Sequence, residues 1–170
     1  MPILKICVRL FGVAILLWGL GTRAVASGEA LGQVIKYGVE TKVVVEDPEA
    51  TFPATHTMPV NVATHHVEVI SRFAEGNPYG GTPGAFFPYL HVTASFVHEA
   101  TGRIVKKRLY GIAHGHRPGL HYGTNLRLPE KGKYGVTITV DPPSDWEIGR
   151  HNDVKGWFEP ITIKLQFVWK

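Results

Sequence analysis

The hydrophobic positions of this chain recur in short runs in which apolar and polar residues alternate or β-branched residues dominate. These runs cover residues 41–46, 62–70, 89–97, 103–110, 134–140 and 161–169. Segments rich in glycine, proline and asparagine separate them, and no segment sustains a 3.6-residue period. Short strands with turn-rich connections are typical of immunoglobulin-like domains. The pattern therefore predicts an all-β domain, an immunoglobulin-like and mostly antiparallel β-sandwich of six or seven strands, with a β-barrel as the alternative.

The N-terminal segment has a pattern of its own. Lys5 and Arg9 precede an apolar run over residues 10–20, which is about half the roughly 20 residues that a membrane-spanning helix needs. Ala24 and Ala26 then form the A-x-A pattern after which signal peptidase cleaves. We expect residues 1–26 to be a cleaved signal peptide, with an uncleaved anchor as the alternative. Residues 27–170 would then be a single exported domain that is not embedded in a membrane.

The net charge of the chain falls once this leader is removed. The chain of 170 residues has 18 Lys and Arg against 14 Asp and Glu. Removing Lys5, Arg9 and Arg23 leaves 15 basic residues against 14 acidic ones. Binding to nucleic acid needs a marked or clustered positive charge, so we exclude it as a function. Cys7 also lies in the leader, so the mature domain has no thiolate ligand and no thiol nucleophile.

Histidine is the residue type that points to chemistry. All nine histidines follow the leader, and His114, His116 and His121 share the glycine-rich stretch 111–123. A stretch this rich in glycine can bend so that several imidazoles meet at one point. Without cysteine, a site built from nitrogen and oxygen donors favours Cu(II), Fe or Zn. We therefore expect a transition-metal ion near these histidines.

The neighbouring pair His65 and His66 lies in a predicted strand, where successive side chains point to opposite faces. At most one of the two can bind a given ion. His65 shares its face with Val67 and is expected to point inward, whereas His66 shares its face with Glu68. His91 and His98 have no acidic or histidine neighbour on the same face, and we interpret both as structural.

Signatures of enzymes are missing from the sequence. It contains no G-x-S-x-G, no H-E-x-x-H, no P-loop and no G-x-G-x-x-G after a strand. We therefore predict a binding protein and not an enzyme. Metal-assisted chemistry remains an alternative if a bound ion keeps an open coordination position.

The part of the chain after residue 62 carries a series of motifs in a fixed order. They are THHVE (64–68), AEGN (74–77), FPYL (87–90), GLHYGTNL (119–126), GKY (132–134), DPP (141–143), RHND (150–153) and WFEP (157–160). Across residues 62–168 their order and spacing resemble the periplasmic Fe2+-transport protein family. The resemblance implies a periplasmic, immunoglobulin-like homodimer that binds copper or iron and serves an iron permease of the inner membrane.

The resemblance also implies a set of metal ligands. His121 occupies the position of the family's metal-binding histidine, and Glu40 that of an acidic ligand near the first strand. His65 and His114 stand where the family has methionines. Imidazole in place of soft sulfur weakens a preference for Cu(I) and suits Cu(II) or iron.

One position departs from the family pattern. A histidine ligand of the family falls on Arg72, whose guanidinium is always protonated and cannot coordinate a metal ion. His66, His116 or Glu68 is available to compensate. The alternatives to a metal-uptake protein are a β-sandwich for adhesion or assembly that binds no metal, and a copper-dependent redox enzyme.

Overall fold

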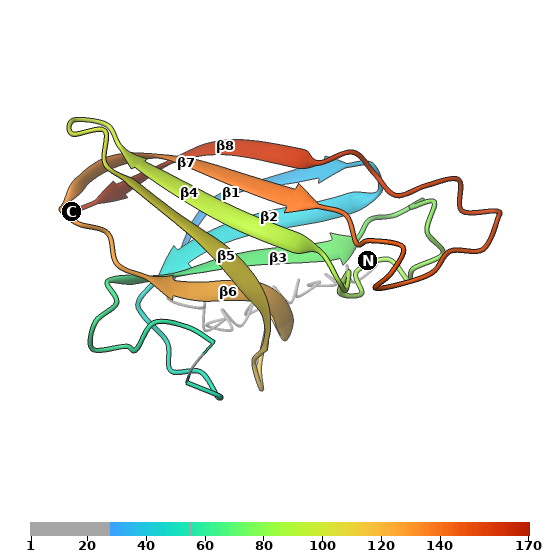
Figure 1. The fold of residues 1–170 in the computed structure, drawn as a ribbon, viewed down its shortest axis with the longest axis horizontal. Helices are drawn as coiled ribbons and strands as arrows, with labels where there is room; N and C mark the ends of the chain where they lie inside the picture. Colours follow the sequence, from blue (N-terminus) through green and yellow to red (C-terminus); the bar gives the residue numbers. More distant parts are fainter. Residues whose placement is uncertain (1–27, 55) are drawn as a thin grey trace, which may run out of the picture.

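The computed structural model describes residues 28–54 and 56–170, which form eight β-strands joined by loops (Figure 1). The signal peptide expected at residues 1–26 lies outside the described residues. Within the described ranges, no helix is long and apolar enough to cross a bilayer. The strands are β1 (Glu29–Lys36), β2 (Val39–Glu46), β3 (His65–Phe73), β4 (His91–His98), β5 (Ile104–Ala113), β6 (Leu120–Leu126), β7 (Gly132–Asp141) and β8 (Ile161–Trp169).

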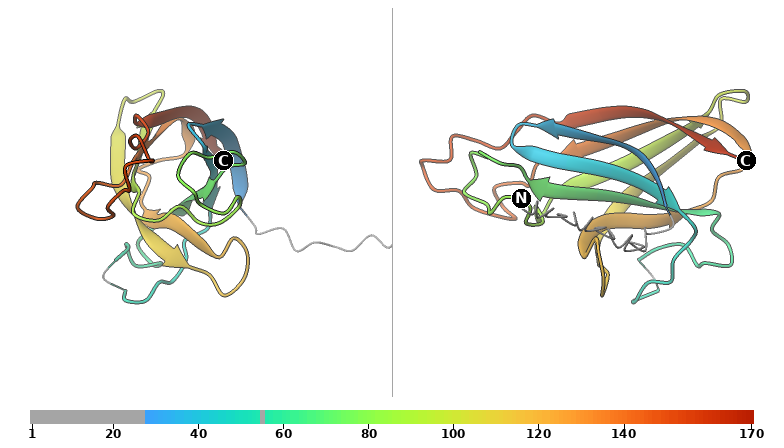
Figure 2. Two further views of the ribbon diagram at one scale, coloured as in Figure 1. Left: turned by 90° about the vertical axis from the view of Figure 1, so that its right-hand side faces the viewer. Right: turned by 180° about the vertical axis from the view of Figure 1, so that it is seen from behind.

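The strands follow the order β1-β2-β3-β6-β5-β4-β7-β8, and every pairing is antiparallel. Strand β5 changes partner along its length, because residues 104–109 pair with β4 and residues 110–113 pair with β6. It thereby joins two layers, one of β1, β2, β3 and β6 and the other of β4, β7 and β8 (Figure 2). On the opposite side β1 meets β8, where Gly32 lies against Leu165. The predicted all-β, antiparallel sandwich is confirmed, in a nearly closed form.

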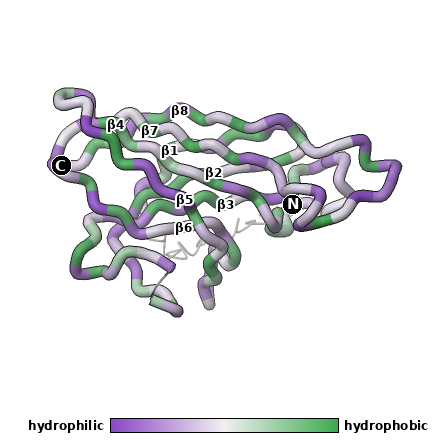
Figure 3. Tube along the Cα trace, viewed as in Figure 1, coloured by the Kyte–Doolittle hydropathy of each residue, from purple (hydrophilic) through white to green (hydrophobic). Residues whose placement is uncertain are grey.

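The core lies between these two layers. Burial alternates along β4 and β7, so that Phe96 and Ile138 are fully buried while the residues between buried positions are partly exposed. Figure 3 shows the same alternation of apolar and polar positions along the strands. This period of two is what a strand with one face on a hydrophobic core requires.

The aromatic residues of two motifs close one end of this core. Phe87 and Phe158 are buried, and their rings lie edge to face with centroids 5.9 Å apart. Trp157 packs against the same cluster. These large aromatic side chains therefore fill the core.

The six predicted runs coincide with β2, β3, β4, β5, β7 and β8, and two strands were not predicted. Strand β1 is mostly exposed and has no strong alternation. It forms a hairpin with β2 through Tyr37 and Gly38, which both have positive φ (53° and 77°), as a tight two-residue turn requires. Strand β6 lies in the histidine-rich stretch that we expected to bend. Only residues 114–119 make a turn there, because β6 is fixed between β3 and β5.

Candidate metal centre

The outer face of β3 and β6, away from the sandwich core, carries a cluster of histidine and glutamate side chains. His66 and Glu68 point to this face, because Val67 and Val69 point to the core. The register pairs His66 with Asn125 and Glu68 with Gly123. Although they lie on the outer face, His66 and Glu68 are buried.

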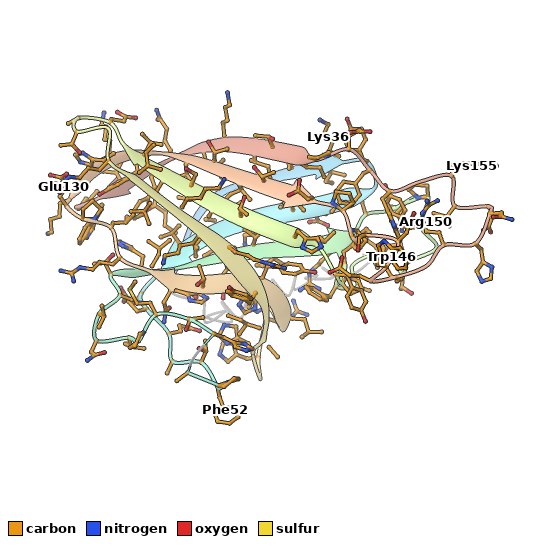
Figure 4. All side chains as sticks on the ribbon, in the orientation of Figure 1. Lys36, Phe52, Glu130, Trp146, Arg150 and Lys155 are labelled. Atoms are coloured by element: carbon orange, nitrogen blue, oxygen red, sulfur yellow. The ribbon has the colours of Figure 1, made fainter. Side chains whose placement is uncertain are left out.

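Two loops account for this burial. Residues 47–54 and 56–64, and the turn 114–119, extend from the same side of the β3–β6 sheet (Figure 1). Figure 4 labels Phe52 at the far tip of the first loop, where its side chain is almost fully exposed. Closer to the sheet, the amide of Asn125 ties this loop to β6. Its Nδ2 donates hydrogen bonds to the carbonyl oxygens of Glu49 (2.7 Å) and Met58 (2.8 Å).

The same amide sets the tautomer of His66. Because Asn125 Nδ2 donates to two carbonyls, its Oδ1 is the acceptor that lies 2.8 Å from His66 Nδ1. His66 Nδ1 therefore carries the proton, and Nε2 presents a lone pair. An orienting hydrogen bond on the other ring nitrogen is the usual arrangement of a metal-binding histidine.

His121 is oriented in the same way by the backbone. Its Nδ1 donates to the carbonyl oxygen of Gly119 over 3.1 Å, so its Nε2 also presents a lone pair. Burial lowers the pKa of His121, with a smaller opposing effect from Glu68, and this favours the neutral ring that a metal ion requires. Among the residues described, the Nε2 atoms of His66 and His121 are buried without a hydrogen-bond partner.

These two nitrogen atoms converge beside Gly123 and Glu68. A Cβ added at Gly123 would lie 2.7 Å from His66 Nε2 and 3.2 Å from His121 Nε2, so the absent side chain leaves room between the rings. The donor atoms of His66, Glu68 and His121 all lie within 4.8 Å of one another. His121 Nε2 is 3.2 Å from Glu68 Oε1. Two donors on one Zn-sized ion lie about 2.8–3.6 Å apart, given bond lengths of about 2.0–2.2 Å and angles of about 90–109°.

A second set of donors lies on the loop side of Glu68. His114 Nε2 is 3.1 Å from Glu68 Oε1 and 3.1 Å from Glu49 Oε2. The ring of His114 stacks on that of His121, with centroids 4.9 Å apart, and on the opposite side on that of His116, at 4.8 Å. His116 is exposed, and its Nδ1 donates to the carbonyl oxygen of Arg117.

Negative charge is concentrated around these histidines. Burial raises the pKa of Glu46 to about 7, and the nearby carboxylates of Glu68, Glu49 and Asp47 add to the shift. Carboxylates held this close together repel one another unless a proton or a metal cation lies between them. The cluster is thus suited chemically to a divalent cation.

A groove of about 690 Å³ leads along the outer face of the sheet to Glu68. Glu40, Lys42, Arg72 and Arg117 contribute its charged side chains. Arg72 binds no carboxylate of the cluster. It donates to the carbonyl oxygens of Gly84 (2.9 Å) and Pro118 (2.6 Å), and so fixes the turn that follows His114 and His116.

The six sequence-predicted ligands fall into two groups. The structure brings together His66, His114 and His121, with His116 stacked at the edge of the cluster. It does not bring His65 or Glu40 to them. His65 points to the core side of β3, as predicted from the alternation, and its ring meets those of Phe167 and Trp169 at 5.1 and 4.9 Å. Glu40 pairs across the sheet with Arg72 and accepts a hydrogen bond from Gln33.

Sequence reasoning missed Glu49, Glu46 and Asn125, and named Glu68 only as a substitute ligand. Glu68 carried a signal, since it lies two residues after His66 and shares its face. Asn125 gave no such signal in the sequence. Its role in orienting His66 follows from the pairing of β3 with β6 and from the course of the loop 47–64. Glu49 reaches the cluster from that same loop.

Comparisons with known proteins agree with this picture. The family model described as Fe2+ transport protein matches residues 29–170. The chain is 31% identical over 139 residues to the UPF0423 protein BAB2_0840 of Brucella abortus (strain 2308), an alignment that covers 78% of this chain and 75% of that protein.

Solved structures show the same fold. A copper-bound variant of FetP from uropathogenic Escherichia coli strain F11 superimposes with a TM-score of 0.76 and 26% identity, over 84% of this chain and 97% of that one. Copper-reconstituted P19 from Campylobacter jejuni gives a TM-score of 0.76 and 25% identity, over 84% of this chain and 96% of the other.

Proposed function

We propose that this chain, which belongs to the Fe2+ transport protein family, is an exported protein that binds a copper or iron ion and supports iron uptake. The ion would be its cargo or resident cofactor, held at the buried cluster on the outer face of β3 and β6. The proposal extends to this chain the copper binding seen in the structures of FetP and P19.

A single observation carries the proposal. The Nε2 atoms of His66 and His121 are buried, and both point to the space beside Gly123. Together with a carboxylate oxygen of Glu68 they lie within 4.8 Å of one another. Leaving a buried polar atom unsatisfied costs roughly 1–3 kcal/mol. Two such atoms that face a carboxylate are explained by a cation that accepts all three as ligands.

The donor types favour particular ions. Two imidazoles, the nearby imidazole of His114 and one or more carboxylates form a nitrogen and oxygen site without sulfur. Such a site suits Cu(II) and iron better than Cu(I). The ligand set proposed here is His66, Glu68 and His121 with His114 adjacent. His116, at the edge of the stack, is the outermost candidate, while His65 and Glu40 are left out.

The biological setting is also proposed. A signal peptide over residues 1–26 would direct the chain to the periplasm, where it would form a homodimer and exchange its ion with an iron permease of the inner membrane. We propose a binding role and not an enzymatic one, since the side chains that converge on this space are ligand types for a metal ion.

The test is metal content and affinity of the purified protein without a histidine tag, for Cu(II), Fe(II) and Zn(II), beside His121→Ala. We expect at least one tightly bound ion per chain in the wild-type protein, and an affinity at least about 100-fold lower in His121→Ala, because losing a ligand costs no less than losing its orienting partner. His151→Ala is the matched control, since His151 is exposed on the loop 142–160.

His65→Leu distinguishes the proposed ligand set from the set that the family resemblance implies, in which His65 is a ligand. It removes an imidazole but keeps apolar volume against Phe167 and Trp169, and we expect it to bind metal as the wild type does. If the wild-type protein bound none of the three ions tightly, the proposal would fail, and a sandwich for adhesion or assembly would be the better interpretation.

A further inference from the structure

The groove on the outer face of the sheet presents three cationic side chains from separate segments of the chain. It is lined by β1, β2 and β3 and by the turn 114–119, and its cations are Lys42, Arg72 and Arg117. We infer that this groove binds a small organic anion with two or three carboxylates, one end of which lies beside Glu68. The anion site is argued from the groove itself, and only its contact with a bound ion rests on the proposed function.

The cations of the groove have no carboxylate partner. None of the three forms a salt bridge with a residue in the described part of the chain. The register places Glu40 directly opposite Arg72, yet Glu40 accepts a hydrogen bond from Gln33 over 2.7 Å. Arg72 is partly buried and has five N–H donors, of which the carbonyl oxygens of Gly84 and Pro118 accept two. A partly buried guanidinium without a counter-ion is costly, so a ligand that supplies carboxylate oxygens here is favoured.

The strand register brings two of the cations within reach of one ligand. Lys42 pairs with Ile70, and Arg72 lies two residues further along β3 on the same face. Such diagonal neighbours are about 7–8 Å apart, a distance that two long side chains span easily. Arg117 approaches the groove from the turn 114–119, so an anion in the groove meets positive charge from more than one side.

The size and lining of the groove favour an organic anion over a simple inorganic one. Its volume of about 690 Å³ lies within the roughly 300–1,000 Å³ of small-molecule sites. Val44, Ile70 and Pro118 provide apolar surface beside the charged groups, which suits a carbon skeleton. Guanidinium groups bind a carboxylate through two parallel hydrogen bonds. A ligand with two or three carboxylates on a short chain therefore fits better than phosphate or acetate.

Glu68 connects the groove to the buried cluster, because it lines the one and belongs to the other. In the metal-free protein the carboxylates of Glu40 and Glu68 offset two of the three positive charges. An ion bound to Glu68 neutralises one of these carboxylates, and three protein ligands leave it a coordination position that a carboxylate oxygen can take. The anion should therefore bind more tightly to the metal-loaded protein, and by linkage the ion should bind more tightly in the presence of the anion.

The first experiment is isothermal titration calorimetry of the untagged metal-free protein at low ionic strength, with tricarballylate as the probe. This tricarboxylate lacks the hydroxyl group of citrate and chelates metal ions only weakly. The protein is freed of metal on a chelating resin, since a soluble chelator would itself be a polycarboxylate anion. We expect one tricarballylate per chain, and no comparable binding of acetate or phosphate.

Lys42→Gln and Arg117→Gln each remove one positive charge while keeping the contacts of Arg72 with the turn. We expect each to bind tricarballylate about 3–10-fold more weakly, and the double variant more than about 10-fold more weakly. Lys164→Gln and Arg127→Gln are the matched controls, since both side chains are exposed and lie outside the groove. Equal binding by the double variant and the wild type, or no saturable binding by the wild type, would refute the inference. So would acetate or phosphate that binds as tightly as tricarballylate.

A second titration separates this inference from the proposed function. With Zn(II) bound, we expect the affinity for tricarballylate to rise at least about 3-fold, because the charge of Glu68 is then neutralised. An unchanged or lower affinity would place the anion away from Glu68 and overturn the inference, while the proposed metal site would stand. If the protein bound no metal ion, the proposed function would fail, and the metal-free titrations would still decide whether the groove is an anion site.

Discussion

At the scale of single residues, the position without a side chain is as important as the ligands. Gly123 lies on β6 directly opposite Glu68, and it has no Cβ to fill the space between the rings of His66 and His121. A methyl group at this point would occupy the volume in which the ion is proposed to lie. The site thus depends on glycine for space, and no positive φ is involved at this position.

We expect Gly123→Ala to weaken metal binding at least about 10-fold while the protein remains folded. The added Cβ would approach His66 Nε2 to 2.7 Å, so that ring has to move out of the geometry fixed by Asn125. Competition titration with a chromophoric chelator measures the affinity. Gly111→Ala on the adjacent strand β5 is the control, because its Cβ would meet nothing within 4 Å. Equal affinities for the two variants would contradict this account of the site.

The carboxylates of the cluster predict a pH dependence of the metal-free protein. The pKa of Glu46 is about 7 in the folded state against an ordinary value of 4.5. The folded state therefore holds this proton to a higher pH than the unfolded chain does. The contribution of Glu46 to stability is fully present below about pH 4.5 and is lost as the pH rises through 7.

Glu46→Gln keeps the side chain neutral at every pH. In the presence of a metal chelator, we expect this variant to be more stable than the wild type at pH 8, and the difference to shrink as the pH is lowered to 5. Urea unfolding of both proteins at the two pH values measures it. The lowered pKa of His121 has the opposite effect, because it reduces stability as the pH falls below 6.5. This effect is the same in the wild type and in Glu46→Gln, so it cancels in the difference between them. A difference that is the same at pH 5 and pH 8 would refute the assigned pKa shift.

At this scale the sequence predicted part of the site. The density of histidines and the absence of cysteine from residues 27–170 indicated nitrogen ligands, and His121 and His114 do lie in one cluster. Nothing in the sequence indicated that Asn125 would orient His66, since its partners come from β3 and from the loop 47–64. Hydrogen bonds between distant segments follow from the pairing of strands, which one sequence does not specify.

At the scale of elements, the alternation along β3 separates two neighbouring histidines. His65 packs against aromatic rings in the core, and His66 faces the cluster of histidine and glutamate side chains on the other side. The sequence predicted this separation correctly, because a period of two is a local property of a strand. It did not predict which of the two would join the cluster, because that depends on where β6 pairs and which loops cover the sheet.

Strand β3 also explains the arginine that departs from the family pattern. Arg72 lies four residues after Glu68, on the same face, and holds the turn 114–119 through the carbonyl oxygen of Pro118. It acts on the cluster through the loop that carries His114, and not as a ligand. Arg72 therefore has a structural role beside the cluster.

We expect Arg72→Met to loosen this turn without unfolding the sandwich. Hydrogen bonds to a charged donor contribute about 1.5–3 kcal/mol each, and the variant loses two of them. Hydrogen exchange followed by mass spectrometry should show faster exchange in residues 114–119, with β6 unchanged. The exposed Arg127→Met is the control. Exchange in the turn that matched the wild type would show that other contacts hold the loop.

At the scale of the whole molecule, the site joins parts of the chain that the core leaves separate. The sandwich places β3 beside β6, and the loops 47–64 and 114–119 then bring Glu49 and His114 to the outer face of that pair. An ion bound at this cluster would link the two loops to the sheet. Because the unfolded chain has no preformed site, binding stabilises only the folded state.

We therefore expect Cu(II) or Zn(II) to raise the melting temperature of the wild-type protein. At a free concentration 100 times the dissociation constant the gain is about 2.7 kcal/mol, which for a domain of this size corresponds to roughly 5–11 °C. Differential scanning calorimetry at several metal concentrations should show the logarithmic increase that mass action requires. His121→Ala should show little or no shift, while His151→Ala should match the wild type. If His121→Ala were stabilised as strongly as the wild type, the ion would bind at a place other than this cluster, and the loops would owe their order to the protein alone.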